Sequence, residues 1–235
     1  MPTPADAALL QDRYGAADAA TVLRAALDHF KGEIAVVSSF GAESVVLLHL
    51  AATIDRAIPV LFVDTGRHFP ETLAYRDELA ERLGLGDVRV VGPSPDAVSR
   101  RDPDGTRATW DPDGCCALRK VSPFNAALEP FAAWITGRKR FQAETRAALP
   151  AFEFEDKRVK VNPLAAWGAA DLAAYARKHS LPQHPLVARG YPSIGCQPCT
   201  RPASADNPRA GRWSGFDKTE CGIHRPASLP LISET

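Results

Sequence analysis

The sequence predicts an α/β fold in which helices cover both faces of a twisted, parallel sheet. Over the first half of the chain, short apolar and β-branched runs alternate with segments of helical apolar spacing. Parallel strands need long crossover connections, so this alternation indicates repeated β-α-β units. The chain has 235 residues, of which 45% are hydrophobic and 24% charged, enough to bury one full core.

The first half follows the order expected of such units. We predict a strand over 33–39, a helix over 43–54, a strand over 59–64, a helix over 70–83 and a strand over 88–91. The second helix begins at Pro70, a favourable first helical residue, and ends before Gly84. Ligands of parallel sheets bind beyond the carboxyl ends of the strands, so residues 38–44 and 64–69 are expected at one shared site.

The second half is less regular. Residues 92–114 are rich in Pro, Gly and Asp and predict a long ordered or lid-like loop. A helix over 115–128, a strand over 131–136 and a helix over 167–180 follow. Periodicity ends near residue 201, so we expect a main domain over 1–205 and a flexible C-terminal tail over 206–235 that carries function.

The overall composition limits the classes of partner. The net charge is zero, which gives no support for nucleic-acid binding over the whole surface. No segment approaches the ~20 apolar residues of a membrane span, and the N-terminus lacks the basic start and apolar run of a secretory signal. We therefore expect a cytoplasmic protein without nucleic-acid or membrane partners, and the sequence leaves a homo-oligomer open.

Basic residues are concentrated in the middle of the chain. Between residues 114 and 146 there are six Lys and Arg residues against two acidic ones. This excess suits a small anionic ligand, although a solvated basic face would show the same composition.

Two loops at predicted strand ends carry polar residues suited to an anion. Residues 38–44 follow a strand and open a helix, so their backbone amides and hydroxyl groups would present hydrogen-bond donors at a helix N-terminus. Residues 64–72 lie at the end of the next strand. Small residues at such turns often serve only the turn, but the two loops are expected to converge.

The five cysteines occur in three settings. Cys115 and Cys116 are adjacent, Cys196 and Cys199 are separated by two residues, and Cys221 stands alone. Four thiolates are the usual ligands of a 4Fe-4S cluster, whereas paired ligands of structural zinc are spaced rather than adjacent. A redox dithiol at the second pair would leave the first pair without a role. The first four cysteines therefore predict a 4Fe-4S cluster, and Cys221 a nucleophile.

Residues 39–44 resemble the phosphate loop of the adenine-nucleotide-hydrolase-like, PP-loop superfamily. Phe40 replaces a glycine and Glu43 an aspartate of the usual loop. We expect the bulky Phe40 side chain to narrow the phosphate cradle, which favours a smaller ligand than pyrophosphate.

Five further segments resemble the assimilatory sulfonucleotide reductases, specifically the cluster-containing adenylyl-sulfate (APS) reductases. These segments are residues 115–120, 134–138, 190–202, 211–213 and 218–224. The resemblance extends over nearly the whole chain. Relatives that use the 3'-phosphorylated substrate (PAPS) usually keep only the tail cysteine, so the presence of all four other cysteines favours APS.

The resemblance implies a thioredoxin-dependent reduction of APS to sulfite and AMP, within sulfate assimilation and cysteine biosynthesis. Cys221 would attack the sulfur to form an S-sulfocysteine intermediate, and thioredoxin or glutaredoxin would release sulfite. The tail would alternately cover the site and present the intermediate to its partner.

The resemblance also implies roles for individual residues. Lys120, Arg209 and Arg212 would surround the phosphosulfate, and His224 would assist the Cys221 thiolate or shape the tail. The AMP part would be held by Ser38, Ser39, Gly41, Asp64, Thr65 and Gly66. Residues 141–146 follow the family's Gln-x-x-Thr-Arg region only loosely and are given no individual role.

Other functions remain open at this stage. A PAPS reductase or a dual-specificity enzyme would share most of these motifs. A PP-loop ATPase that modifies tRNA would need a pyrophosphate cradle and a nucleic-acid surface, neither of which is apparent. A non-catalytic zinc-binding module would be indifferent to the loss of Cys221.

Overall fold

The computed structural model describes residues 1–204, 206–218 and 220–224. Six strands form one sheet in the order β3-β2-β1-β4-β6-β5. Every neighbouring pair is parallel except the hairpin of β5 and β6. The strands are β1 (Ile34–Val37), β2 (Val60–Val63), β3 (Val88–Val91), β4 (Ala133–Ile135), β5 (Phe152–Glu155) and β6 (Arg158–Val161).

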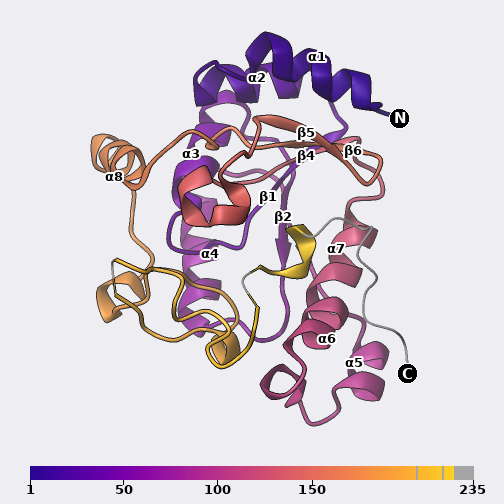
Figure 1. Ribbon diagram of the computed structural model, residues 1–235, viewed down its shortest axis with the longest axis vertical. Helices are drawn as coiled ribbons and strands as arrows, with labels where there is room; N and C mark the ends of the chain where they lie inside the picture. Colours follow the sequence, from indigo (N-terminus) through magenta and orange to yellow (C-terminus); the bar gives the residue numbers. More distant parts are fainter. Residues whose placement is uncertain (205, 219, 225–235) are drawn as a thin grey trace.

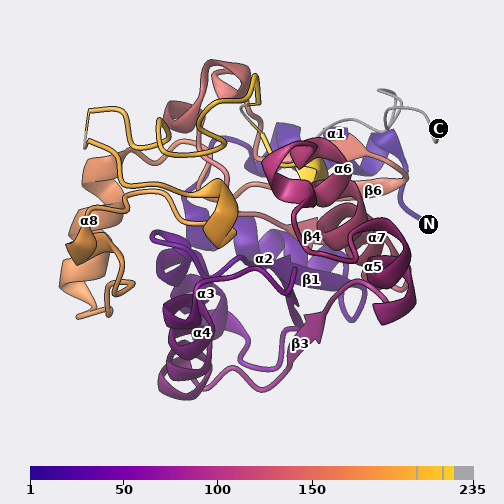
Figure 2. The same cartoon turned by 90° about the horizontal axis from the view of Figure 1, so that it is seen from below.

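Helices cover both faces of this sheet, as predicted (Figures 1 and 2). The main helices are α1 (Pro4–Tyr14), α2 (Ala19–His29), α3 (Ser44–Ile54), α4 (Pro70–Leu83), α5 (Pro95–Arg101), α6 (Pro112–Cys116), α7 (Ser122–Ala127) and α8 (Ala169–Lys178). Helices α2, α3 and α4 contribute to the larger core on one face, whereas α7 packs on the other. The predicted α/β class is confirmed.

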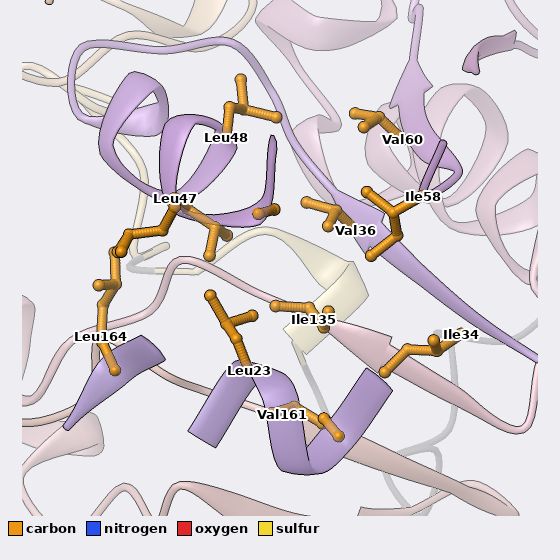
Figure 3. Packing of buried hydrophobic residues seen from close by; sticks show 14 of the residues in the cluster. Leu23, Ile34, Val36, Leu47, Leu48, Ile58, Val60, Ile135, Val161 and Leu164 are labelled. Atoms are coloured by element: carbon orange, nitrogen blue, oxygen red, sulfur yellow. The ribbon is translucent and has the colours of Figure 1, made fainter. Parts of the chain in front are cut away.

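The larger core shows why the strands are so apolar. Side chains from α2 and α3, including Leu23 and Leu47, point toward Val36 of β1 and Ile135 of β4 (Figure 3). The opposite face of the same strands carries Ala35 and Trp134, which pack with α7 in a second cluster. Burial on both faces leaves no polar positions on the central strands.

The prediction of a long loop over 92–114 is wrong, because this segment contains helix α5 and the start of α6. The Ser94 side chain accepts a hydrogen bond from the Ala97 amide, and Pro95 occupies the first turn. The Asp111 side chain caps α6 in the same way through the Gly114 amide, ahead of Pro112. Prolines that suggested a loop therefore stand at the starts of helices.

The predicted helix over 115–128 is present but interrupted. A π-helical turn, Ala117–Val121, separates α6 from α7. Helices α1 and α2 and the β5-β6 hairpin are additional elements that no prediction covered. The hairpin turns at Asp156 and Lys157, whose φ angles are 51° and 67°. These left-handed angles match a tight hairpin connection.

The described part of the C-terminal tail packs against the main domain. It contains one short 3-10 turn, Gly222–His224, and an isolated bridge between Thr200 and Arg212. Trp213 and Lys218 are buried. The segment with Gly222–His224 lies beside α7, where it is drawn in yellow in Figure 1. Residues 219 and 225–235 of the predicted tail, and residue 205 at the end of the predicted main domain, lie outside the described residues.

Candidate functional site

A cavity of about 580 Å³ opens at the carboxyl ends of β1 and β4. The strand order runs outward from β1 in one direction and from β4 in the other, so these ends form the switch point of the sheet. Four parts of the chain supply most of the lining: residues 37–44 at the end of β1, residues 134–146 around the end of β4, residues 192–195, and tail residues from Asp206 to His224. The cavity lies at the carboxyl ends of the strands, where the sequence predicts a binding site, and part of the predicted set lines it.

The loop after β1 contributes Ser38, Ser39 and Gly41 to the lining, as the sequence suggested. The Gly41 amide donates to the Ser44 hydroxyl group over 3.0 Å. A Cβ atom at Gly41 would lie 3.2 Å from the carbonyl oxygen of Ile194. Glycine therefore allows the loop to approach residues 192–195 closely.

The expectation that Phe40 narrows the cradle is wrong. The Phe40 side chain is fully buried and lies edge-on to Phe62, with ring centroids 5.6 Å apart. Its φ angle of 48° lies in the left-handed region. The backbone thus adopts the conformation that a glycine would favour, while the ring points into the core. The size of residue 40 does not argue against a pyrophosphate ligand.

The loop after β2 is only partly in the cavity. Val63 and His68 line it, but Asp64, Thr65 and Gly66 do not. Asp64 instead accepts a hydrogen bond from the Gly66 amide over 2.8 Å, which closes a tight turn. The Thr65 hydroxyl group lies 3.2 Å from the Cys196 sulfur, so it faces the cysteine residues.

The four cysteines predicted as ligands come from α6 and from the segment before the tail. Cys115 and Cys116 are buried and Cys196 and Cys199 are half-buried. Burial raises the pKa of Cys115 to about 12, and the nearby thiols of Cys116, Cys196 and Cys199 add to this effect. Burial likewise raises the pKa of Cys199 to about 11, with further contributions from Cys196 and Cys116. These mutual effects place the four thiols in one neighbourhood.

A buried ion pair supports the loop beside these thiols. The Arg119 guanidinium donates to Asp102 over 2.8 Å and to the carbonyl oxygen of Thr65 over 3.1 Å. The side chains are 7% and 1% exposed. Arg119 therefore ties helix α5 and the loop after β2 to the segment that follows Cys116. In the described ranges of the chain, no three His, Cys, Asp or Glu side chains converge as ligands of a single metal ion.

Lys120 lies between the cysteines and the cavity. It lines the cavity and follows Cys116 within the π-helical turn. Burial alone would lower the pKa of Lys120, but attraction to the thiolate forms of Cys196, Cys221 and Cys116 outweighs this effect and raises it. The side chain is thus kept as a cation that neighbours both cysteine settings.

Arg209 and Arg212 reach the cavity from the tail. Their guanidinium carbons lie 5.9 and 4.5 Å from the centroid of the Trp213 ring. A Cβ atom at Gly195 would lie 2.2 Å from an Arg212 nitrogen. A side chain at this position would have to displace the Arg212 guanidinium, so the segment before Cys196 and the tail fit together closely.

Sequence reasoning noted the basic excess of this segment but assigned no role to three buried basic residues that line the same cavity. They are Arg138, Lys139 and Arg146, all buried, so the solvated basic face considered for this segment is wrong. Lys139 pairs with Glu43 over 2.6 Å, and burial lowers the pKa of Lys139 against the opposing effect of Glu43. Six Lys and Arg side chains line the cavity against three acidic ones. The local excess of basic residues was the available signal for an anion site.

Cys221 and His224 line the same cavity. The His224 ring is stacked on Trp134 of β4, with centroids 5.8 Å apart and an angle of 6° between the planes. Burial lowers the pKa of His224 well below 6.5, and the positive charges of Lys160, Arg138, Arg146 and Lys120 lower it further. The imidazole is therefore neutral.

The cavity thus brings together eight of the residues that the sequence singled out: Ser38, Ser39, Gly41, Lys120, Arg209, Arg212, Cys221 and His224. A match to the phosphoadenosine phosphosulfate reductase domain covers residues 33–202, more than half of the chain. The chain belongs to this family. In its described residues, no helix is both long and apolar enough to cross a bilayer.

Similar proteins agree with this assignment. An adenosine 5'-phosphosulfate reductase from Chelativorans sp. (strain BNC1) is 51% identical over 239 residues, covering 99% of this chain and 98% of the relative. Another from Mesorhizobium japonicum is 54% identical over 202 residues, with coverage of 86% and 80%. The crystal structure of a phosphoadenylyl-sulfate (PAPS) reductase from Candida auris, a phosphate complex, matches with a TM-score of 0.72 and 25% identity. That match covers 84% of this chain and 97% of the other.

Proposed function

We propose that this protein reduces APS to sulfite and AMP in the assimilation of sulfate. One observation carries the proposal: a tail cysteine, Cys221, opens onto a cavity lined by six Lys and Arg side chains at the switch point of the sheet. Relatives at 51% and 54% identity are named APS reductases and are matched over most of their length.

The chemistry follows from a thiolate beside an anion site. The Cys221 sulfur attacks the sulfur atom of the substrate, an S–S bond forms, and the S–O bond to the phosphate breaks. AMP leaves with the electron pair of that bond, and S-sulfocysteine remains on the enzyme. Lys120, Arg209 and Arg212 stabilise the charge that develops on the departing phosphate.

A dithiol protein such as thioredoxin or glutaredoxin completes the reaction. One of its thiolates attacks the Cys221 sulfur, and sulfite leaves with the electrons of the S–S bond. The second partner thiol then resolves the mixed disulfide and restores Cys221. The two electrons that reduce sulfur from the sulfate to the sulfite level come from this dithiol. The part of the tail that holds Cys221 in the cavity must move for the partner to reach this residue. The reaction would take place in the cytoplasm, which keeps dithiols reduced.

We also propose a 4Fe-4S cluster held by Cys115, Cys116, Cys196 and Cys199. The donor set fits, because four thiols share one partly buried neighbourhood and each would bind a different iron atom. The Thr65 hydroxyl group at 3.2 Å from Cys196 offers a hydrogen bond to a ligating sulfur. When bound, such a cluster adds negative charge, which the adjacent Lys120 is placed to balance.

The AMP part of the substrate is assigned to Ser38, Ser39 and Gly41, which line the cavity. Asp64, Thr65 and Gly66 act through the shape of their turn. The structure favours the tail-shaping role for His224, because its neutral ring is stacked on Trp134.

The proposal is tested by replacing Cys221 with Ser. With APS and no dithiol, the wild-type protein should release one equivalent of AMP and gain one sulfonate group on the peptide that contains Cys221. The Ser variant should bind APS normally but release no sulfite, because it has no thiolate and its hydroxyl group stays protonated at neutral pH. Sulfonate on Cys196 or Cys199, or dithiol-dependent activity in the variant, would contradict the assignment.

A further inference from the structure

The tail is fastened to the main domain on both sides of Cys221. We propose that Glu220 is a positioning residue that holds Cys221 in the cavity by binding Arg146 and Arg209, and that release of this carboxylate frees Cys221 for the dithiol partner. The role in catalysis rests on the proposed function, whereas the fastening itself can be tested without substrate.

The contacts of Glu220 are those of a strong, sheltered ion pair. The Arg146 Nε and Nη2 atoms donate to the two carboxylate oxygens over 2.8 and 2.6 Å. A second guanidinium, that of Arg209, lies 3.6 Å away. The side chains of Arg146 and Glu220 are 8% and 15% exposed. Bidentate pairs of this kind are among the strongest polar contacts in proteins, and burial reduces their screening by salt.

Arg146 is itself held by residues near the proposed AMP-binding loop. Its Nη1 atom donates to the Gln142 side chain over 2.6 Å, and Gln142 in turn donates to Glu43 over 2.8 Å. Glu43 belongs to the loop that follows β1 and lines the cavity. A continuous chain of hydrogen bonds therefore connects the proposed AMP-binding loop with the residue before Cys221.

The residues after Cys221 form the other attachment. The His224 amide donates to the Cys221 carbonyl oxygen over 3.2 Å, and its ring is stacked on Trp134. A Cβ atom at Gly222 would lie 2.7 Å from a methyl carbon of Val121, so the chain lies tightly against the π-helical turn. The stacking contact is apolar, whereas the Glu220 contact depends on charge. Only the latter can be displaced by another anion in the cavity.

The first test measures how fast Cys221 reacts with iodoacetamide in the substrate-free protein, by mass spectrometry of the peptide that contains it. Glu220→Gln removes the charge and keeps the size, so we expect Cys221 to be alkylated about tenfold faster than in the wild type. Glu71→Gln is the matched control, because Glu71 forms an exposed pair with Arg189 away from the cavity. This control should react at the wild-type rate.

A double-mutant cycle identifies the partner. Arg146→Gln should accelerate alkylation as Glu220→Gln does, and the double variant should react no faster than either single one. Circular dichroism and the melting temperature show whether each variant is folded. In Glu220→Asp, which keeps the charge on a shorter side chain, the alkylation rate of Cys221 should lie between the rates of the wild type and of Glu220→Gln. An alkylation rate in folded Glu220→Gln equal to that of the wild type would refute the fastening.

The second test separates the two half-reactions. In Glu220→Gln, the AMP burst with APS should slow, and discharge of isolated S-sulfocysteine enzyme by reduced thioredoxin should accelerate, because the tail opens more easily. A merely destabilised protein would show both steps slowed, and that outcome would overturn the positioning role. If wild-type protein gives no AMP burst, the proposed function fails, while the alkylation result still decides whether Glu220 fastens the tail.

Discussion

Replacing Phe40 with glycine sets two energetic effects against each other in the loop that follows β1. Glycine would relieve the left-handed backbone at φ 48°, a strain of about 1 kcal/mol for a non-glycine residue. It would also delete a side chain that is fully buried against Phe62. Large-to-small changes at such aromatic positions cost about 3–5 kcal/mol. The cavity effect is larger, so we expect a net loss of about 3 kcal/mol in the free energy of unfolding.

Urea unfolding followed by tryptophan fluorescence measures this loss as a free energy, and thermal unfolding measures it as a change in melting temperature. For a chain of this size, each kcal/mol corresponds to about 2–4 °C, so the melting temperature should fall by about 6–12 °C. Phe216→Gly serves as the control, because Phe216 is 39% exposed, and surface changes usually stay within about 0.5 kcal/mol. A Phe40→Gly variant as stable as the wild type would show that the ring is not a core residue and would refute this reasoning.

Four other measurements test the site. Anaerobically purified protein should contain iron and acid-labile sulfide and lose both in Cys116→Ser; zinc in their place would contradict the cluster. APS should have a much higher kcat/KM than PAPS, since no additional basic motif for a 3'-phosphate is evident in the loops; equal values would indicate a dual-specificity enzyme. His224→Phe should keep the stack on Trp134 and retain activity, whereas complete loss of sulfite formation would assign the imidazole to the chemistry. Burial lowers the pKa of His184 from 6.5 to about 4, so the unfolded protein binds a proton more readily than the folded protein does. Stability should therefore fall as the pH drops from about 6.5 toward 4. The urea midpoint of His184→Asn should depend less on pH, and an unchanged pH dependence would exclude His184 as the cause.

Local patterns in the sequence were sufficient for the central sheet and its helices. Strands β1, β2 and β3 are short apolar runs, and α4 carries its own signals in Pro70 and Gly84. Proline was ambiguous, because it both breaks helices and begins them. Only the capping contacts of Ser94 and Asp111 distinguish the two cases at α5 and α6.

The position of the cavity was predictable from local sequence patterns, whereas the contacts within it were not. The cysteine spacing separated Cys221 from the other four cysteines, and in the structure Cys221 lines the cavity while the other four do not. The predicted strand ends lie at this cavity. The contact of Arg146 with Glu220 joins residues 74 positions apart in the sequence. No local sequence pattern predicts a contact between residues so widely separated. The direction of the Phe40 ring was likewise hidden, because it depends on a backbone angle that a phenylalanine rarely adopts.

The π-helical turn Ala117–Val121 determines how helix α6, with its two cysteines, is rotated relative to the packed face of helix α7. Upstream, α6 presents Cys115 and Cys116; downstream, α7 buries Phe124 against Trp134. Each residue in an α-helix advances the side-chain direction by ~100°. The extra residue in the wide turn therefore lets α6 keep its cysteines in their present direction while α7 keeps Phe124 against Trp134. Deleting one residue between 117 and 121 would convert the turn to regular α-helix and rotate the cysteine pair away from its present direction while α7 stays packed. Single-residue insertions and deletions here should therefore be tolerated far less well than a conservative substitution at Ala117, which is only half-buried.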